Sequence, residues 1–283
     1  MALAQTELVA QRLRAVGYAV ELVRILTEGD VRPVDTTPGE GMFVTALASA
    51  LKRREIDIAV HSAKDVPLED DAELLIAAYP ERSDARDALV TRSGDQSIAG
   101  LPPNASIGTD SPRRAGFVRA ARQDLRVVPL HGNIDTRLRR LDSGEVDALV
   151  IAAAGLDRLG RGGRIDQRID VHAMPPAPAQ GALAVQARRA DDGLLRMLAV
   201  IDHPDVRVAV EAERQVLAAT GGTCRAPVGA FARVEEDDFQ MVVGGVNSDG
   251  SDLTVESIRG RREDSSHAAH EAGHRLARAV ALR

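Results

Sequence analysis

The densest group of residues that could carry chemistry is the run Gly-Thr-Asp-Ser-Pro-Arg-Arg, which ends at Arg114. Ser111 is a favoured residue at the N-cap of a helix, and Pro112 suits the first helical position. Arg113 and Arg114 are therefore predicted to lie in the first turn of a helix that follows a strand. Free backbone N–H groups, hydroxyl groups and two guanidinium groups converge there, and this combination binds anions.

Arginines continue beyond this run. Eight arginines and three aspartates lie between residues 110 and 140, which gives this stretch a charge of +5 in a chain whose net charge is −6. Arg137 stands near another predicted helix start, and loops at strand ends are frequent ligand sites. We therefore expect Arg137 to bind the same kind of ligand. We interpret three other arginines as part of a solvated helix face, namely Arg119, Arg122 and Arg126.

Lys64 and Asp65 stand side by side in the run His-Ser-Ala-Lys-Asp-Val-Pro, directly after a predicted strand. A carboxylate at a strand end that faces a wall of arginines can stabilise positive charge that develops during a reaction. The alternative is a turn that holds a local ion pair, and the spacing alone favours neither.

Cys224 is the single cysteine of the chain and follows Gly221 and Gly222. A lone cysteine is more often a small buried hydrophobic residue than a nucleophile. The two glycines, however, predict an exposed and irregular loop, and the adjacent Arg225 favours the thiolate. Both interpretations stay open at this point, and no histidine in the sequence is an obvious base for the thiol.

A possible zinc motif occurs in the run His-Glu-Ala-Gly-His, which ends at His274. No histidine, aspartate or glutamate follows it to supply a third ligand, and the glycine weakens the helix that the motif requires. We therefore predict no metal site.

The elements that position these residues repeat along the chain. A helix over residues 42–54 leads into a strand at Ile56–Val60, and a helix over residues 136–142 leads into a strand at Val146–Ile151. Aligning Glu55-Ile-Asp with Glu145-Val-Asp gives an offset of 145 − 55 = 90 residues. Continuous apolar strands of this kind are typical of parallel sheets that are covered on both faces. Two lobes of one α/β plan are the simplest interpretation, with the ligand at the carboxyl ends of the strands.

Other segments complete the expected organisation. Apolar spacing predicts a helix over residues 3–16 and a strand over residues 20–26. A late hairpin is predicted from Phe239–Val246 and Leu253–Ile258, followed by a helix over residues 265–282. The proline-rich run over residues 174–181 is interpreted as a hinge or linker.

Composition excludes several classes of protein. The chain has 283 residues, of which 44% are hydrophobic and 28% charged, as in ordinary globular proteins. No apolar run approaches the roughly 18 residues of a membrane helix, and the first residues do not resemble a secretory signal. We therefore expect a cytoplasmic protein with no membrane partner. The net charge of −6 and the 2% aromatic content argue against a nucleic-acid partner.

Six motifs together resemble the porphobilinogen deaminase, or hydroxymethylbilane synthase, family. They occur in the family's order and span nearly the whole chain. The motifs are His-Ser-Ala-Lys-Asp-Val-Pro (61–67), Gly-Thr-Asp-Ser-Pro-Arg-Arg (108–114), Gly-Asn-Ile-Asp-Thr-Arg (132–137), Ala-Gly-Leu-Asp-Arg-Leu (154–159), Pro-Ala-Gln-Gly-Ala (178–182) and Cys-Arg-Ala-Pro-Val-Gly (224–229).

This resemblance implies two α/β lobes of the type II periplasmic-binding-protein plan and a small C-terminal α+β domain that carries the cofactor cysteine. The expected division is residues 1–81 with 182–200, residues 86–176, and residues 203–283. It also implies a dipyrromethane cofactor joined by a thioether to Cys224. Four porphobilinogen units are added to it head to tail with loss of ammonia, and water then releases hydroxymethylbilane, a precursor of heme and other tetrapyrroles. The chain is expected to act as a monomer.

The resemblance further assigns roles to individual residues. Asp65 is expected to contact the pyrrole N–H groups and to stabilise the azafulvenium cation that forms when ammonia leaves. Acidic groups of the cofactor are expected to bind Lys64, Ser111, Arg113 and Arg114. The residues expected at the substrate are Arg137, Arg158, Phe43, Gln5 and Asn133.

Four departures from the family pattern support a second hypothesis. The family's opening strand is not found in this sequence, because Met1 falls within the following helix; we expect either that the domain lacks this strand or that the sequence starts downstream of the real start. Glu40, Asp110 and His131 replace a lysine, a serine and an arginine. Each replacement removes positive charge or a hydroxyl group from an anion site. The alternative is therefore a two-lobed anion-binding paralogue that has lost turnover. A cysteine-dependent acyl-transfer enzyme ranks lower, because no paired histidine is found.

Overall fold

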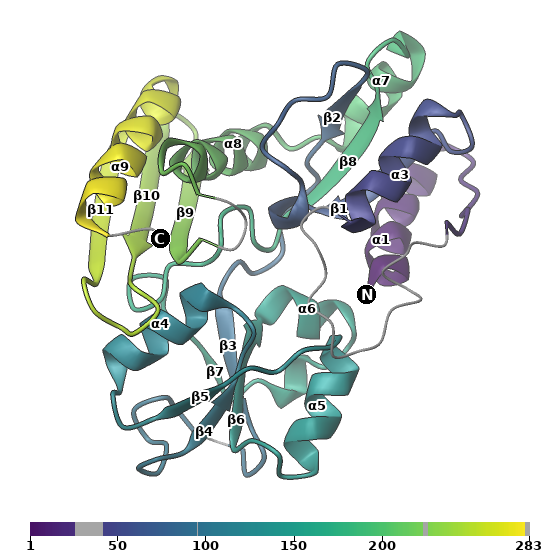
Figure 1. The fold of residues 1–283 in the computed structure, drawn as a ribbon. Coiled ribbons are helices and arrows are strands. Elements are labelled where there is room, and N and C mark those ends of the chain that lie inside the picture. The colour runs from purple at the N-terminus through teal and green to yellow at the C-terminus, as the bar shows by residue number, and fades with distance from the viewer. Residues whose placement is uncertain (26–41, 95, 223–225, 281–283) are drawn as a thin grey trace.

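The computed structural model describes residues 1–25, 42–94, 96–222 and 226–280, with the backbone alone for residues 42 and 43. These residues form three sheets, each with its own helices (Figure 1). Lobe 1 is built on the sheet β1-β8-β2, lobe 2 on the sheet β5-β4-β6-β3-β7, and the C-terminal domain on the sheet β11-β10-β9. The predicted fold class, two α/β lobes with a smaller α+β domain, is confirmed. No helix of the described residues combines the length and the apolar character needed to cross a membrane.

Lobe 1 is a three-stranded antiparallel sheet between helices. Its central strand β8 (Leu183–Arg188) pairs with β1 (Ile58–Ser62) on one side and β2 (Leu74–Ala78) on the other. Every residue of β8 is buried, because α1 (Ala2–Ala15) packs on one face of the sheet and α3 (Met42–Lys52) on the other. A short helix, α7 (Asp192–Leu198), follows β8.

Two expectations for this lobe are wrong. Over its described part, the strand predicted for residues 20–26 has no regular structure. An apolar run becomes a strand only where a neighbouring strand takes its backbone hydrogen bonds, and here Leu22 and Val23 are exposed to solvent. The parallel arrangement expected for β1 is also absent, since β1 pairs with β8 in antiparallel register.

Lobe 2 is a mixed sheet whose side chains alternate between two cores. Leu89 and Val150 face α4 (Pro112–Ala121), whereas Val90 and Leu149 face α5 and α6 on the opposite side. This two-residue period is the one that strands impose. The remaining bounds are β3 (Asp87–Thr91), β4 (Ser106–Gly108), β5 (Arg126–Val128), α5 (Ile134–Asp142), β6 (Ala148–Ala152), α6 (Ala153–Arg158) and β7 (Gln167–Arg168).

The internal repeat is visible in the two lobes. Strands β1 and β6 begin at Ile58 and Ala148, which are 148 − 58 = 90 residues apart, and each runs directly into a helical turn. The turn after β1 is a 3-10 helix at Ala63–Asp65, and the turn after β6 is α6. The repeat thus places Lys64 and Asp65 at a strand end, as the sequence predicted.

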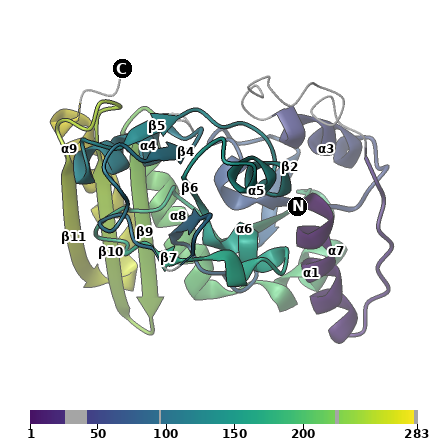
Figure 2. The same cartoon turned by 90° about the horizontal axis from the view of Figure 1, so that it is seen from below.

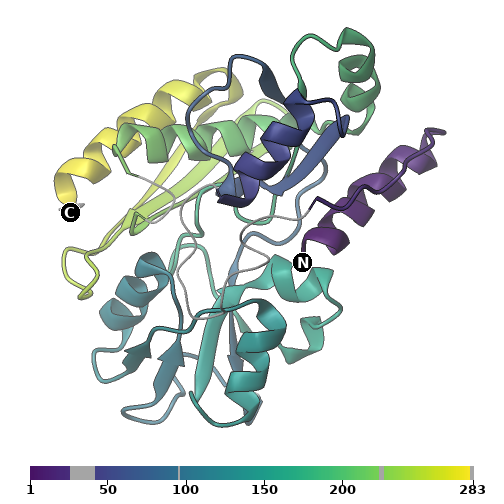
Figure 3. The ribbon, with the colours of Figure 1, turned by 45° about the vertical axis from the view of Figure 1, so that its right-hand side comes forward.

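The C-terminal domain packs two helices on one face of an antiparallel sheet (Figure 3). The predicted hairpin is β10 (Asp238–Gly245) with β11 (Thr254–Arg261), and β9 (Val228–Glu235) adds a third strand that the sequence analysis missed. The helices are α8 (Pro204–Ala219) and α9 (Ser265–Ala279). Helix α4 of lobe 2 lies beside this domain (Figure 2), and a Cβ atom at Gly116 would approach a side-chain carbon of Val246 to 2.6 Å.

Two segments cross between the lobes, which we call crossing segment 1 (residues 79–86) and crossing segment 2 (residues 174–182). They lie side by side, since the Ser83 N–H donates to the carbonyl of Gly181 at 3.1 Å. Most of crossing segment 2 is buried, including all three prolines. Linkers are exposed to solvent, whereas this segment is part of the protein interior. The interpretation of the run as a linker is wrong in this respect.

Glu213 of α8 fastens both crossing segments to the C-terminal domain. Its fully buried carboxylate accepts two hydrogen bonds from the Arg82 guanidinium, at 2.6 and 2.9 Å. It also accepts from the N–H of Ala179 at 2.6 Å and of Ala232 in β9 at 2.7 Å. Both crossing segments and the C-terminal domain thus meet at one carboxylate whose oxygens both have hydrogen-bond partners.

Gly181→Ala should lower the free energy of unfolding by more than about 2 kcal/mol, because it adds a clash to the cost of a left-handed alanine. Gly181 has φ +86°, and a Cβ atom there would lie 2.6 Å from the Ser83 carbonyl oxygen. Gly160→Ala is the control, since Gly160 has φ +66° and no atom within 4 Å of the added carbon. Urea unfolding measures both variants, and equal losses would contradict the close approach of the crossing segments.

Candidate functional site

The centre of the site is a buried carboxylate that binds two arginines. Asp87 begins β3 and is completely buried. One of its oxygens lies 2.7 Å from the Arg113 guanidinium, and the other accepts from Arg114 Nε at 2.9 Å. Burial by itself raises the pKa of Asp87, but Arg113, Arg114 and the Gln180 amide outweigh it and hold the pKa at about 2. One positive charge of the two arginines therefore remains uncompensated by Asp87.

The sequence folds locally to aim these arginines inward. Ser111 caps α4 by accepting from the Arg114 N–H at 3.4 Å, with Pro112 at the first helical position, as predicted. This cap fixes the first turn of the helix against the end of β4. The Arg113 guanidinium also donates to the Pro175 carbonyl of crossing segment 2 at 2.7 Å.

Gln180 of crossing segment 2 connects the arginines to lobe 1. Its side-chain oxygen accepts from Arg114 and from Lys64 Nζ, each at 3.2 Å, and its amide donates to Asp87 at 2.9 Å. The pKa of Lys64 is lowered to about 8. Burial is the largest cause and the charges of Arg113 and Arg114 add to it, whereas Asp65 and Asp87 oppose it. Lys64, Arg113 and Arg114 are thus brought together, although they come from different lobes.

Asp65 ends the 3-10 turn after β1. Asp65 is exposed to solvent. The surrounding protein nevertheless removes part of the hydration of its carboxyl group, which raises the pKa of that group. Lys64 partly offsets this rise. A carboxylate with incomplete hydration interacts strongly with a nearby cation. Among the described residues, Lys64 is the cation whose charge acts on this carboxyl.

A small cavity joins the three parts of the molecule next to these groups. It has a volume of about 30 Å³ and is lined by Lys64 of lobe 1 and by Ser111 and Arg113 of lobe 2. Residues of crossing segment 2 and of the C-terminal domain complete it, among them Ala226. Cys224 and Glu40 lie outside the described residues, but Ala226 is only two positions after the cysteine in the sequence.

Arg137 and Asn133 start α5 at the carboxyl end of β5. Asn133 is the N-cap of the helix and accepts from the Thr136 N–H at 2.9 Å. Arg137 donates through Nε to the Gly132 carbonyl at 2.8 Å, and burial lowers the pKa of its guanidinium, as does the nearby Arg114. Arg137 therefore belongs to the same cationic group as Arg114.

Arg158, at the end of α6, touches both crossing segments. One terminal nitrogen lies 3.3 Å from the Ser83 hydroxyl and 2.6 Å from the Gly181 carbonyl. The Nε of Arg158 and that of Arg113 are buried without a hydrogen-bond partner among the described residues. Unsatisfied buried donors of this kind are costly unless a ligand or water completes them.

Two further predicted residues lie on lobe 1. Gln5 of α1 is buried and donates to the Ser62 hydroxyl at 2.7 Å, so it holds the end of β1 just before the Lys64–Asp65 turn. The side chain of Phe43 is not among those described, although its backbone belongs to the first turn of α3.

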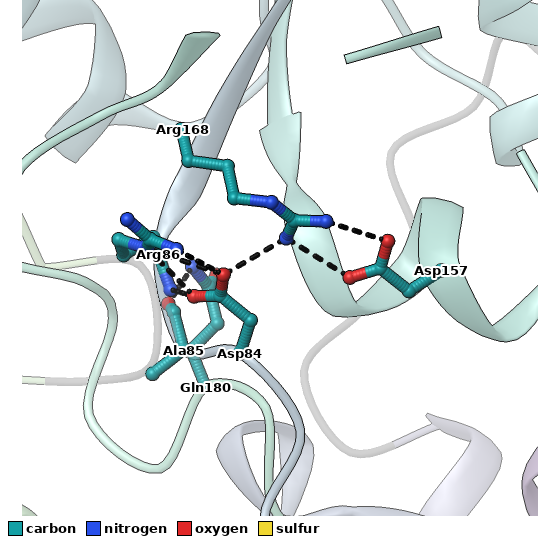
Figure 4. Close-up of polar contacts among 6 residues, drawn as sticks. All are labelled: Asp84, Ala85, Arg86, Asp157, Arg168 and Gln180. Atoms are coloured by element: carbon teal, nitrogen blue, oxygen red, sulfur yellow. Dashed lines mark hydrogen bonds and ion pairs between the residues drawn. The ribbon is translucent and has the colours of Figure 1, made fainter. Parts of the chain in front are cut away.

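An ion network on the lobe 2 side holds crossing segment 1 in place (Figure 4). Arg168 of β7 contacts Asp84 at 2.8 Å and forms a two-pronged contact with Asp157 at 2.8 and 3.0 Å. Asp84 also accepts from Arg86. Asp157 directly precedes Arg158, so this network fixes the helix end from which Arg158 projects.

The arrangement suits a ligand or cofactor with several carboxylates. The cationic side chains Lys64, Arg113, Arg114, Arg137 and Arg158 gather between the lobes, and two of them retain an unpartnered Nε. Guanidinium groups bind carboxylates through paired hydrogen bonds. The described residues therefore fit an oligo-acidic group.

Three residues of this network were not predicted from the sequence, namely Asp87, Gln180 and Glu213. Asp87 could have been found as the one charged residue in an otherwise apolar strand, Asp-Ala-Leu-Val-Thr. Gln180 lay within a motif that was noted but interpreted as a hinge. Glu213 carries no local signal, since glutamate is ordinary in a helix and only the tertiary fold buries it.

Profiles of one protein family match most of the chain. The profile described as porphobilinogen deaminase, dipyromethane cofactor binding domain, matches residues 1–196, and that of the porphobilinogen deaminase C-terminal domain matches residues 207–281.

Curated relatives agree with these profiles. A porphobilinogen deaminase of Acidothermus cellulolyticus is 47% identical over 98% of this chain and 84% of the relative. That of Roseiflexus castenholzii is 42% identical over 94% of this chain and 88% of the relative. Among solved structures, a substrate-binding domain of a putative amino acid ABC transporter from Streptococcus pneumoniae is weakly similar, with a TM-score of 0.43 and 16% identity over 77% of this chain and 84% of that one.

Proposed function

The chain belongs to the porphobilinogen deaminase family, and from this premise we propose which of its residues carry the reaction. It is a transferase of tetrapyrrole biosynthesis with a dipyrromethane cofactor, and it condenses four porphobilinogen units and releases hydroxymethylbilane. The observation that carries the assignment of residues is the meeting of Lys64, Ser111 and Arg113 in one cavity with Ala226.

When bound, the cofactor supplies a covalently held primer for the growing chain. Cys224 would hold it by a thioether, as a nucleophile that acts once and then remains an anchor. Lys64, Ser111, Arg113 and Arg114 would bind its acidic side groups. Asp87 neutralises only one of the two positive charges of Arg113 and Arg114. A carboxylate bound there would neutralise the second charge, which supports this role.

Asp65 would act as the catalytic carboxylate. Loss of ammonia from porphobilinogen leaves positive charge on the substrate pyrrole, and a preorganised carboxylate stabilises such charge without having to reorient. Incomplete hydration strengthens this interaction. The same side chain would accept a pyrrole proton.

Arg137 and Arg158 would bind the acetate and propionate groups of the substrate. The orphaned Nε of Arg158 and the partial burial of Arg137 support this assignment. Asn133 would orient the first turn of α5, which carries Arg137, and Gln5 would hold the end of β1 that precedes the turn with Asp65. Phe43 would lie at the entrance to the cleft.

The lobes are proposed to move as the product lengthens. The units would be residues 1–81 with 182–200, residues 86–176, and residues 203–283. Each contains one of the three sheets, and the crossing segments lie between them. Hinge motion about two such segments changes the width of a cleft without disturbing the cores.

The protein is proposed to act as a monomer in the cytoplasm. Each sheet has a hydrophobic core closed by helices of the same chain. The large hydrophobic side chains that are exposed belong to four stretches of the described chain, residues 1–16, 22–23, 197–200 and 253–255, and some exposure of this kind is ordinary for a folded protein. Light scattering of the purified protein measures the mass, and a stable dimer would contradict the proposal.

Intact mass of the purified protein, with and without Cys224→Ala, tests the assignment of the anchor. After expression with porphobilinogen available, the unchanged protein should carry an added dipyrromethane mass, and the alanine variant should not. An adduct on the variant would refute Cys224 as the anchor. Ammonia release from porphobilinogen tests the function separately, and its absence in loaded protein would favour the paralogue without turnover.

Cofactor loading should slow above pH 8 because Lys64 loses its proton there. In the cofactor-free protein the pKa of Lys64 is about 8, so raising the pH from 7 to 9 should lower the loading rate, relative to Lys64→Arg, by about tenfold. Ionisation of the Cys224 thiol at higher pH should speed loading in both proteins alike, so dividing the loading rate of the unchanged protein by that of the arginine variant removes this effect. Lys52→Arg is the matched control, because Lys52 pairs with Asp71 on the surface. A ratio that does not change with pH would contradict the role of Lys64.

A further inference from the structure

One carboxylate lies within the cationic group that surrounds Arg137. Asp110 follows the end of β4 and directly precedes the N-cap Ser111 of α4. Its charge acts on Arg137, where it opposes the lowering of the guanidinium pKa by burial. A negative charge at this place weakens the attraction of Arg137 for a second anion, so the site needs a compensating group.

His131 supplies that group from the loop between β5 and α5. Its Nδ1 lies 2.8 Å from an Asp110 carboxylate oxygen, and the two side chains are 25% and 23% exposed. The loop is held in place, because the His131 carbonyl accepts from Arg140 at 3.4 Å and the next carbonyl accepts from Arg137 at 2.8 Å. The imidazole is therefore positioned against Asp110 before any substrate arrives.

We propose that His131 is a specificity-determining residue that neutralises Asp110, so that protonation of the imidazole sets how strongly Arg137 holds the carboxylates of porphobilinogen. The inference rests on the proposed function of Arg137. Among the described residues, Asp110 from the β4–α4 loop contacts the imidazole, and Arg137 and Arg140 of α5 donate to the backbone carbonyls of Gly132 and His131 beside it.

The sign of the effect follows from the charges. With a protonated imidazole, the His131–Asp110 pair is neutral and the charge of Arg137 is free to act on the substrate. With a neutral imidazole, the pair carries −1, which attracts Arg137 and repels the substrate carboxylates. Loss of the imidazole proton should therefore raise KM. A rise of about three- to tenfold is expected for one unit charge a few ångström away in a solvated cleft.

A double-mutant cycle on the cofactor-loaded enzyme tests the proposal. His131→Gln should raise KM for porphobilinogen at pH 6 by about three- to tenfold with little change in kcat. Adding Asp110→Asn to that variant should return KM close to its original value. In the unchanged enzyme KM should rise when the imidazole loses its proton at alkaline pH, whereas the double variant should show no such rise. Intact mass confirms that every variant carries the cofactor.

The outcomes separate this inference from the proposed site. Arg137→Leu should raise KM more than His131→Gln does, and Arg139→Gln on the exposed side of α5 is the control. If Arg137→Leu leaves KM unchanged, the proposed substrate site is wrong. If Arg137→Leu raises KM but Asp110→Asn fails to rescue His131→Gln, or the pH dependence persists in the double variant, the role of His131 is overturned.

Discussion

Asp65→Asn is expected to lower kcat by about a thousandfold or more, the loss that follows removal of a preorganised charge at a reacting centre. Asparagine keeps the size and the hydrogen-bonding ability of the side chain but cannot neutralise the cation on the substrate pyrrole. The cofactor should still be attached, because loading happens once over the hours of expression whereas turnover requires repeated condensations. Ammonia release measures kcat, and intact mass measures loading.

Asp70→Asn is the control for this prediction, since Asp70 is exposed in the loop that follows. It should leave kcat unchanged. In the unchanged enzyme, activity should fall as the pH drops through the raised pKa of Asp65, because the protonated carboxyl has no charge. An Asp65→Asn enzyme that retains more than a tenth of the original kcat would show that the carboxylate is not the catalytic group.

Asp87→Asn should destabilise the cofactor-free protein by about 3 kcal/mol or more, because it leaves two buried guanidinium groups without their counter-charge. Urea unfolding at pH 7 measures this loss. The native pKa of about 2 is below the ordinary value, so Asp87 stabilises the fold above about pH 4, and this contribution is lost as the pH falls from 4 to 2. The difference between the two proteins should therefore shrink in that range.

Asp57→Asn is the matched control for Asp87. Asp57 also pairs with an arginine, Arg188, but its side chain is 78% exposed, and surface pairs contribute about 1 kcal/mol or less. Asp87→Asn should also slow cofactor loading, since Arg113 and Arg114 lose the group that holds them in place. Equal stability losses in the two variants would contradict the buried centre.

Local chemistry made much of the site predictable from the sequence. The serine cap, the proline and the arginines of α4 form one local unit, so their placement needed no knowledge of the fold. The same holds for Lys64 and Asp65, which the repeat places at a strand end. Asp87, Gln180 and Glu213 were missed because their partners are distant in sequence, and only the packing of the lobes turns ordinary polar residues into a buried network.

The wrong expectations have the same origin. The apolar run at residues 20–25 has the composition of a strand, but pairing depends on which neighbour the rest of the chain provides. The run of prolines in crossing segment 2 is typical of a linker in isolation, yet the lobes close over it. Arg122 was interpreted as solvated, whereas its guanidinium donates to the carbonyls of Ile98, Ala99 and Leu101, which a helix pattern cannot indicate.

The four contacts of Glu213 tie the C-terminal domain to both crossing segments. A rotation of one lobe against the other bends a crossing segment, and either segment is bound through this carboxylate to α8 and β9. Under the proposed lobe motion, the C-terminal domain would therefore turn together with the lobes. With Cys224 as the proposed anchor, the fixed end of a growing tetrapyrrole would travel with that rotation, and the range of the motion would then limit the length of product that the cleft accommodates.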